Sequence, residues 1–284
     1  MSTIGEAILY SAAKRLYRTE IAQTQEMKDS LSDIDSYDQF RSGEAEKVMA
    51  ALARYGIDLR NKRVIDFGCN DGALSERYRR AGAMVTGVDI DAEAITRAKQ
   101  LHPDIAFCLS GVDGIPLPDA SADVIVSFDV FEHVAQPESI LREMRRILAP
   151  GGRVVIGTIG WWSPFAPHLW STMPVPWAHV LFRERTVLRA CRRVYHSPWY
   201  RPTMHDLDAE GKRLPDKYTA DEIPREYLNH YLLRDFERAF RDACFDSSTY
   251  AVPIHNLRPL RPLCRLPWFR ELLSASVWFV LTAA

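Results

Sequence analysis

The sequence lacks a basic excess and lacks cysteine pairs with the spacing of metal ligands. Its 284 residues hold 36 lysines and arginines against 37 aspartates and glutamates, for a net charge of −1. Proteins that wrap nucleic acid usually carry a basic excess, so this balance disfavours an RNA or DNA substrate. The five cysteines form no C-x-x-C pair. That absence argues against a metal site and a disulfide framework, and predicts reduced, buried thiols.

Long apolar runs are also missing. Glu6 interrupts the apolar stretch near the N-terminus, and Lys14 and Arg15 follow it, so it does not have the pattern of a signal peptide. The run over residues 276–283 is far shorter than the about 20 apolar residues that span a bilayer, and it predicts a buried strand. We therefore expect a soluble, cytoplasmic protein without a transmembrane segment.

What the sequence does contain is a regular alternation of short apolar runs and helix-like segments. Strands are predicted at 64–67, 85–89, 105–109, 123–128 and 153–158, with helices at 73–81, 92–101 and 137–148. Alternation at this spacing is typical of βαβ units with right-handed crossovers around a parallel sheet. The pattern resumes later with a helix at 232–243 and strands at 248–252 and 277–282.

The flanking residues divide the chain further. Residues 1–60 look helical, with a second helical segment near 43–55. Residues 160–230 break the alternation with many prolines and five of the seven tryptophans, over a length far beyond an ordinary loop. We expect an N-terminal helical cap (1–60), a core (61–159), an inserted lid (160–230) and a C-terminal completion of the core (231–284). In the first helix, apolar residues follow helical spacing at Ile4, Ala7, Ile8, Ala12 and Leu16.

A glycine-containing turn follows the first predicted strand. Gly68 permits a sharp turn close to a ligand, and Gly72 lets the next helix pack near the strand. Asp89 ends the second strand about 20 residues further on, where a carboxylate accepts hydrogen bonds from both hydroxyls of a ribose. Asn70 and Ala73 replace the second and third glycines of a pyrophosphate-binding turn, which disfavours a dinucleotide. Taken alone, the turn is equally consistent with having no ligand.

Five motifs follow one another in order along this region. They are Val64–Gly72, Val88–Asp91, Ile115–Asp119, Asp123–Val134 and Leu148–Arg153. Together they resemble the core of class I methyltransferases, in particular the group often called type-11 methyltransferases. The resemblance covers about a third of the chain. It implies a Rossmann-like methyltransferase fold, which is a doubly wound α/β fold with a seven-stranded, mostly parallel sheet and an antiparallel last strand. It also implies S-adenosylmethionine as the cofactor.

The resemblance further implies which residues border the cofactor. In chain order they are Gly68, Cys69, Asn70 and Gly72, then Asp89 and Ile90, then Val112 and Asp113, then Phe128 and Asp129. The first turn would border the methionine part, Asp89 the ribose, Ile90 the adenine, and the last pair the sulfonium. Family members usually carry an acidic residue at the position of Gly111. The backbone of Val112 and the side chain of Asp113 are therefore expected at the adenine edge.

Histidines are the candidate bases. Methyl transfer to an alcohol or phenol requires a base that removes the proton of the acceptor, whereas transfer to an amine, thiolate or carboxylate depends less on a base. His133 follows Glu132 directly after the fourth strand, and a histidine accepts a proton near neutral pH. His168 and His179 lie among tryptophans and prolines of the insert and are the other candidates. The alternatives are that His133 only orders the helix start or the cofactor, and that the other two are packed or surface residues.

Arginines gather in the insert. Residues 183–202 contain six arginines and one glutamate. This run is either a solvated helix face, or a site for an anionic, partly apolar substrate, or a peripheral contact with an acidic membrane. We expect methylation, with oxygen as the acceptor atom, of a small or medium-sized natural product, sugar or glycan, or lipid-linked molecule. An RNA-modifying methyltransferase, a non-catalytic cofactor-binding domain and a nicotinamide-dependent oxidoreductase are the alternatives. The oligomeric state is not indicated.

Overall fold

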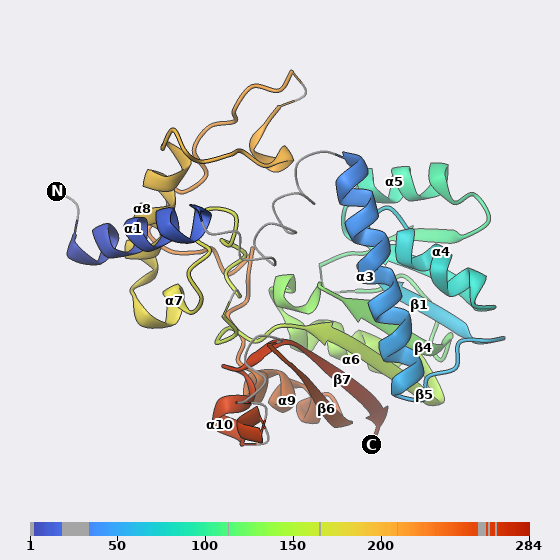
Figure 1. Ribbon diagram of the computed structural model, residues 1–284. Helices are drawn as coiled ribbons and strands as arrows, with labels where there is room; N and C mark the ends of the chain where they lie inside the picture. The colour runs from blue at the N-terminus through green and yellow to red at the C-terminus, as the bar shows by residue number, and fades with distance from the viewer. Residues whose placement is uncertain are drawn as a thin grey trace. The chain divides into compact units, whose positions relative to one another are not determined.

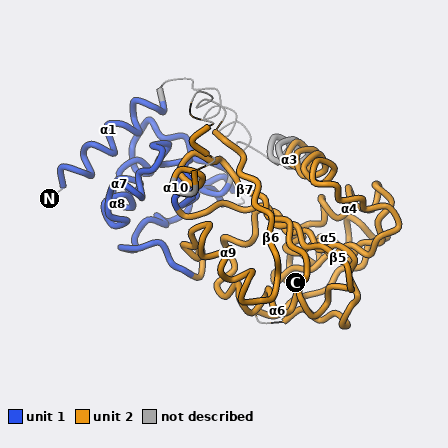
Figure 2. The backbone as a smooth tube through the Cα atoms, turned by 90° about the horizontal axis from the view of Figure 1, so that it is seen from below, with its two compact units in different colours: residues 1–41, 162–225 blue, residues 42–161, 226–284 orange. Residues whose placement is uncertain are grey.

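The computed structural model describes residues 3–18, 34–112, 114–164, 166–208, 210–254, 260, 262–264 and 266–284. The chain divides into two compact units, which Figure 2 distinguishes by colour. The core unit comprises residues 42–161 and 226–284, and the second unit comprises residues 1–41 and 162–225. The division into a cap, core, lid and C-terminal completion stays a prediction. Asp113 lies outside the described residues.

A seven-stranded sheet forms the centre of the core unit, with strand order β3-β2-β1-β4-β5-β7-β6 (Figure 1). Adjacent strands from β3 to β5 are parallel, and β7 is antiparallel to both β5 and β6. This confirms the expected doubly wound, mostly parallel sheet with an antiparallel last strand. The strands are β1 (Arg63–Phe67), β2 (Met84–Asp89), β3 (Ala106–Leu109), β4 (Ala122–Phe128), β5 (Leu148–Thr158), β6 (Phe245–Pro253) and β7 (Ser274–Ala283).

Helices cover both faces of this sheet. Apolar residues of α3 and α4 pack with Val64, Val126 and Val155 on one face. Those of α6 and α9 pack with Ile65 and Ile125 on the other, because successive residues of a strand point to opposite faces. The helices of the core unit are α3 (Ile34–Arg54, which enters the unit at residue 42), α4 (Ala73–Arg80), α5 (Ala92–Leu101), α6 (Pro137–Ile147), α9 (Leu233–Asp242), α10 (Pro267–Arg270) and the 3-10 turn η1 (Phe131–His133).

The two largest differences from the element boundaries that the sequence predicted are at β5 and α3. The strand β5 begins at Leu148 rather than at Arg153, because Leu148 already pairs with Ala122 before an irregularity in the register. Helix α3 begins at Ile34, earlier than the expected segment near 43–55. Neither difference moves the carboxyl ends of β1, β2 and β4, where an open α/β sheet binds its ligands.

The second unit is built around two packed helices. It contains α1 (Ile4–Arg18), α7 (Ala178–Leu181), α8 (Glu184–Tyr195) and the 3-10 turn η2 (Met204–Asp206). Helix α1 forms as predicted, but Ile4, Ala7 and Ile8 are exposed, and its buried face runs through Leu9 and Ala13. Helical spacing alone was a poor guide to the buried face, because apolar residues occur around most of this helix. No helix among the described residues is long and apolar enough to cross a membrane.

Candidate active site

The first turn of the core unit is shaped by two glycines in the left-handed region. Gly68 has φ 79°, and a Cβ there would collide with the side chain of Val130. Gly72 has φ 85°, and a Cβ there would lie 2.7 Å from the ring of Phe107. Any other residue at these positions would have to displace a neighbour. The two glycines therefore let Val130 and Phe107 pack closely against the turn at the carboxyl end of β1, and its contact with a ligand stays a prediction.

Asp89 joins this turn to the end of β2. Its Oδ2 accepts a hydrogen bond from the backbone N–H of Asn70 at 2.8 Å, and its Oδ1 accepts one from the N–H of Asp91 at 2.9 Å. Each carboxylate oxygen has two lone pairs, so one on each oxygen remains for a further donor. The carboxylate is thus oriented by the backbone on both sides, which fits it to receive two neighbouring hydroxyl groups. Its contact with a ribose stays a prediction.

Two apolar side chains are exposed beside Asp89. Ile90 is 59% exposed and Val112 is 68% exposed, at the carboxyl ends of β2 and β3. The two strand ends are adjacent, because the N–H of Ser110 donates to the carbonyl of Asp89 at 2.8 Å. An exposed apolar side chain at a strand edge suits the flat face of a base, so the contact of Ile90 with the adenine, and that of the Val112 backbone with the adenine edge, stay predictions.

The loop after β3 is held by a residue that the sequence analysis did not single out. Arg146 on α6 donates to the backbone carbonyls of Ile115 and Leu117, each at 2.9 Å. It also pairs with Asp119 at 2.6 Å and with Glu143 at 2.8 Å. Arg146 lies two residues before the predicted motif Leu148–Arg153, so its place in the sequence was a usable signal. These contacts fix the loop that follows Val112.

The end of β4 carries the predicted sulfonium-facing pair. The ring of Phe128 stacks on that of Trp278, with centroids 5.3 Å apart and planes at 18°. A Cβ at Gly157 would lie 2.7 Å from Phe128, so this glycine makes room for the stack. Asp129 takes φ 53°, and its N–H donates to the carbonyl of Gly157 at 2.9 Å. The role of Phe128 and Asp129 toward the sulfonium stays a prediction.

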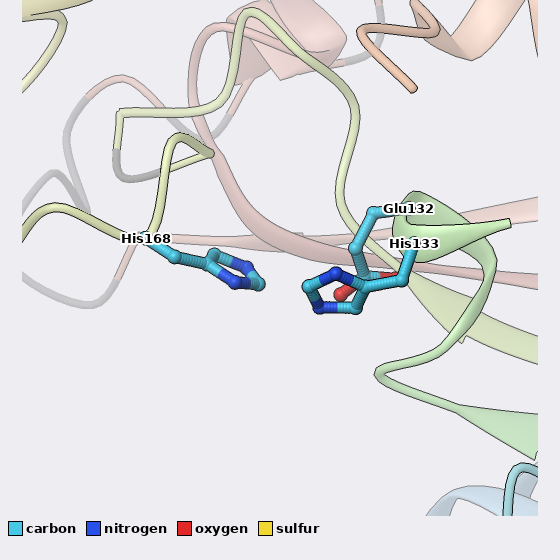
Figure 3. A group of neighbouring side chains, drawn as sticks. All are labelled: Glu132, His133 and His168. Carbon is cyan, nitrogen blue, oxygen red and sulfur yellow. The ribbon is translucent and has the colours of Figure 1, made fainter. Parts of the chain in front are cut away.

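Glu132 and His133 follow on the η1 turn, where Figure 3 draws both side chains. Glu132 is 4% exposed, and its Oε2 accepts a hydrogen bond from Thr158 Oγ1 at 2.6 Å. Burial raises the pKa of Glu132 to about 7, although the hydrogen bond from Thr158 lowers it. A buried carboxyl group that titrates near neutral pH therefore lies beside the candidate base.

His133 has a defined tautomer. Its Nδ1 lies 2.7 Å from the backbone carbonyl oxygen of Tyr227. A carbonyl oxygen only accepts hydrogen bonds, so Nδ1 carries the proton. In the neutral ring Nε2 is then the basic nitrogen. The ring of Tyr227 stands edge-on to the imidazole at 5.5 Å. The structure thus orients His133 as a base would be oriented, while its catalytic role stays a prediction.

Asn229 holds the η1 turn in place, and sequence reasoning missed it. Its side-chain amide donates to the carbonyls of Phe131 at 2.6 Å and Val134 at 2.9 Å. Its backbone N–H donates to the carbonyl of Glu132 at 2.8 Å. Asn229 is 5% exposed, so each of these bonds is shielded from water. Nothing in the pattern around residue 229 indicated this role, because its partners lie almost a hundred residues earlier.

His168 and His179 belong to the second unit. His168 is half-buried, with φ 55°. His179, on α7, is 8% exposed and lines a cavity of about 10 Å³ with Trp170 and Met173. That volume is about enough for one water molecule. The catalytic role of both histidines stays a prediction.

The region that contains the predicted cofactor residues is similar to known proteins. Residues 65–156 match a family model described as a methyltransferase domain. The match begins within β1 and ends within β5, and it contains all ten residues predicted to border the cofactor. This chain carries a methyltransferase domain. The match and the fold confirm the class I methyltransferase resemblance, and S-adenosylmethionine, the methyl donor of that class, is the cofactor of the domain.

Individual relatives agree with the family. An uncharacterized methyltransferase from Mycobacteroides abscessus is 33% identical over 118 residues, which are 40% of this chain and 46% of that protein. A ubiquinone biosynthesis O-methyltransferase from Pseudomonas aeruginosa is 34% identical over 106 residues, or 36% of this chain and 46% of that protein. The chain thus spans about half the length of these curated relatives.

A solved structure shows the same fold over a larger part of the chain. The S-adenosylmethionine dependent methyltransferase from Mesorhizobium loti has a TM-score of 0.50 and 18% identity to this chain. The similarity covers 82% of this chain and 95% of that one. It extends beyond residues 65–156 and therefore includes elements of the fold outside the family match.

Proposed function

We propose that the protein transfers a methyl group from S-adenosylmethionine to an oxygen atom of a small or medium-sized acceptor, with His133 as the base. The observation that carries the choice of oxygen is the Nδ1 hydrogen bond from His133 to the carbonyl of Tyr227. It leaves Nε2 as the basic nitrogen at the carboxyl end of β4, and a hydroxyl acceptor is the kind that needs a base. The O-methyltransferase among the relatives supports the same choice.

The residues around the first turn fit the cofactor. Asp89 accepts hydrogen bonds from the two ribose hydroxyls through the lone pairs that its backbone donors leave. Ile90 would pack on the adenine through an apolar side chain that is otherwise exposed to water, and the backbone of Val112 would meet the adenine edge. When bound, S-adenosylmethionine supplies an electrophilic methyl group on a sulfonium. Gly68 keeps the turn close enough for the backbone to contact the methionine part.

Glu132 and His133 act on the proton of the acceptor. His133 accepts the proton that the acceptor hydroxyl releases, and the Tyr227 carbonyl stabilises the protonated ring by accepting from Nδ1. Glu132 is buried next to it with a pKa of about 7, so part of the population carries a negative charge beside the ring. The acceptor is proposed to be a natural product, a sugar or glycan, or a lipid-linked molecule.

The test combines binding with turnover. Calorimetry should detect binding of S-adenosylmethionine and of its demethylated product, but not of NAD. A panel of phenols, sugar alcohols and polyprenyl alcohols, each incubated with labelled S-adenosylmethionine, should yield a labelled ether whose rate rises with pH through the titration of a single base. Amine and thiol acceptors are tested in the same assay, and a labelled methylamine or thioether, with no labelled ether, would overturn the oxygen assignment. Cofactor binding without product from any acceptor would support a non-catalytic domain.

A further inference from the structure

The second unit exposes apolar side chains from two of its helices. Ile4 and Ile8 on α1 are 83% and 54% exposed, and Val180 and Leu181 on α7 are 40% and 71% exposed. We call these four residues the apolar face. Single exposed apolar residues are ordinary, but a group of large ones is a feature of interaction surfaces.

The two parts of the apolar face are connected through α1. A Cβ at Gly5 would lie 3.2 Å from the ring of Phe182 and 3.2 Å from the methyl group of Thr186. Gly5 is next to Ile4, and Phe182 is next to Leu181, so the contact brings the exposed residues of both helices to the same end of the unit. Within a helix, Ile4 and Ile8 are four positions apart and share one side.

Basic residues follow both parts of the apolar face along the chain. Lys14 and Arg15 follow it on α1, and Arg183, Arg185 and Arg189 follow it at the start of α8, where all three arginines are exposed. Among these, Arg185 pairs with Asp221 at 2.9 Å on the surface, with both side chains more than half exposed. Such a pair is weak and is screened by salt.

The acidic residues of α1 and α8 form contacts within the second unit. Glu6 on α1 is 6% exposed and lies 3.6 Å from Arg193. Glu184 on α8 accepts a hydrogen bond from the backbone N–H of Ile223 at 2.9 Å. The surface that α1 and α8 present to solvent is therefore positive, although the whole chain has a net charge of −1.

We infer that the apolar face and its basic surroundings dock the second unit on an anionic lipid surface. Apolar side chains flanked by lysine and arginine are the composition of helices that lie in the membrane interface, where Ile and Leu enter the acyl boundary and the cations meet the headgroups. A purely apolar partner surface would not use the surrounding positive charge. The inference is independent of the acceptor and of the methyl transfer itself.

Vesicle flotation tests the inference. The full-length protein should float with vesicles of equal parts phosphatidylcholine and phosphatidylglycerol, and not with pure phosphatidylcholine. The double variant Ile4→Ser, Leu181→Ser should bind the anionic vesicles at least about tenfold more weakly, because each side chain loses the free energy of leaving water. The matched control is Leu101→Ser at the end of α5 in the core unit, where Leu101 is 62% exposed, and it should bind as the wild type does.

Three outcomes would overturn the inference. One is equal binding of the double variant and the Leu101→Ser control, since the apolar face would then play no part. Another is binding that does not weaken when salt is raised, because the contribution of the cations must be screened. The third is self-association of the wild type that the double variant abolishes, with no vesicle binding by either, which would assign the face to a second copy of the chain. Circular dichroism at each step verifies that the variants are folded.

Discussion

The first turn and the η1 turn lie at the carboxyl ends of neighbouring strands, but contacts of very different range hold them. The side chain of Asp89 accepts a hydrogen bond from the backbone N–H of Asn70, which lies 19 residues earlier in the chain. His133 is held by Tyr227, 94 residues later, and Phe131 by Asn229, 98 residues later. One β-α-β unit therefore builds the part of the site expected to hold the cofactor. The part expected to move the proton is completed only when residues 226–231 return to the sheet.

This difference predicts that the two turns can be damaged separately. A change at Asp89 should affect cofactor affinity, and a change at His133 or Asn229 should affect turnover. If the site were a single rigid network, each substitution would lower both quantities together. The variants below are ordered from the largest expected effect to the smallest.

Replacing His133 should have the largest effect on turnover. His133→Ala removes the basic nitrogen that we assign to proton transfer, and we expect kcat for an alcohol or phenol acceptor to fall by about 10²- to 10⁴-fold. The affinity for the cofactor product, measured by calorimetry, should change much less. Equal losses in both quantities would move His133 to a supporting role at the cofactor.

Replacing Asp89 should have the converse effect. Asp89→Ala removes the acceptor of two backbone N–H groups and of the two expected ribose hydroxyls, each worth about 1.5–3 kcal/mol when the acceptor is charged. We expect the Kd for S-adenosylmethionine to rise about 100-fold or more. The exposed Asp104→Ala variant is the matched control. Unchanged binding by Asp89→Ala would contradict the proposed position of the cofactor.

Glu132 predicts a pH dependence of stability. Its pKa is about 7 in the folded protein and 4.5 as the reference value, so the folded state binds its proton more tightly than the unfolded state does. The contribution of Glu132 to the free energy of unfolding therefore falls by about 3 kcal/mol as the pH rises from about 4.5 to about 7. Above that range this contribution is constant. The variant Glu132→Gln replaces the carboxyl group with an amide, which still forms hydrogen bonds but does not titrate.

Urea unfolding at a series of pH values measures this effect. The free energy of unfolding of Glu132→Gln, relative to the wild type, should increase by about 3 kcal/mol between pH 4.5 and pH 8. The exposed Glu93→Gln variant is the control for the loss of a carboxylate elsewhere in the core unit. A difference between Glu132→Gln and the wild type that is constant with pH would mean that Glu132 is not protonated preferentially in the fold.

The same contrast in range explains what could be read from the sequence. Gly68, Gly72 and Asp89 belong to one short stretch, so their spacing predicted the turn, the strand ends and the order of the elements. Asn229 and Tyr227 act on residues almost a hundred positions away, and no periodicity or motif records such a contact. The buried face of α1 was also missed, because α1 packs on α8, which lies far along the chain.

Asn229→Ala tests whether long-range contacts position the base, and we expect the smallest effect of the four. The variant leaves the carbonyls of Phe131 and Val134 without their buried donors, so kcat should fall about tenfold while the Kd for the cofactor stays within about twofold. A purely structural role would lower the melting temperature without changing the pH profile. A positioning role should shift the pH at which turnover is half-maximal, because the environment of His133 changes.

The conservative variant and the control complete this comparison. Asn229→Asp keeps the acceptor for the N–H of Tyr231 but loses the donors to both carbonyls, so it should behave as Asn229→Ala does and not as the wild type. Gln136→Ala, an exposed amide at the start of α6, should leave kcat and its pH profile unchanged. If Asn229→Asp restored full turnover, the donated hydrogen bonds would be irrelevant to His133. The η1 turn would then be held well enough by its other contacts, such as the hydrogen bond from the backbone N–H of Asn229 to the carbonyl of Glu132.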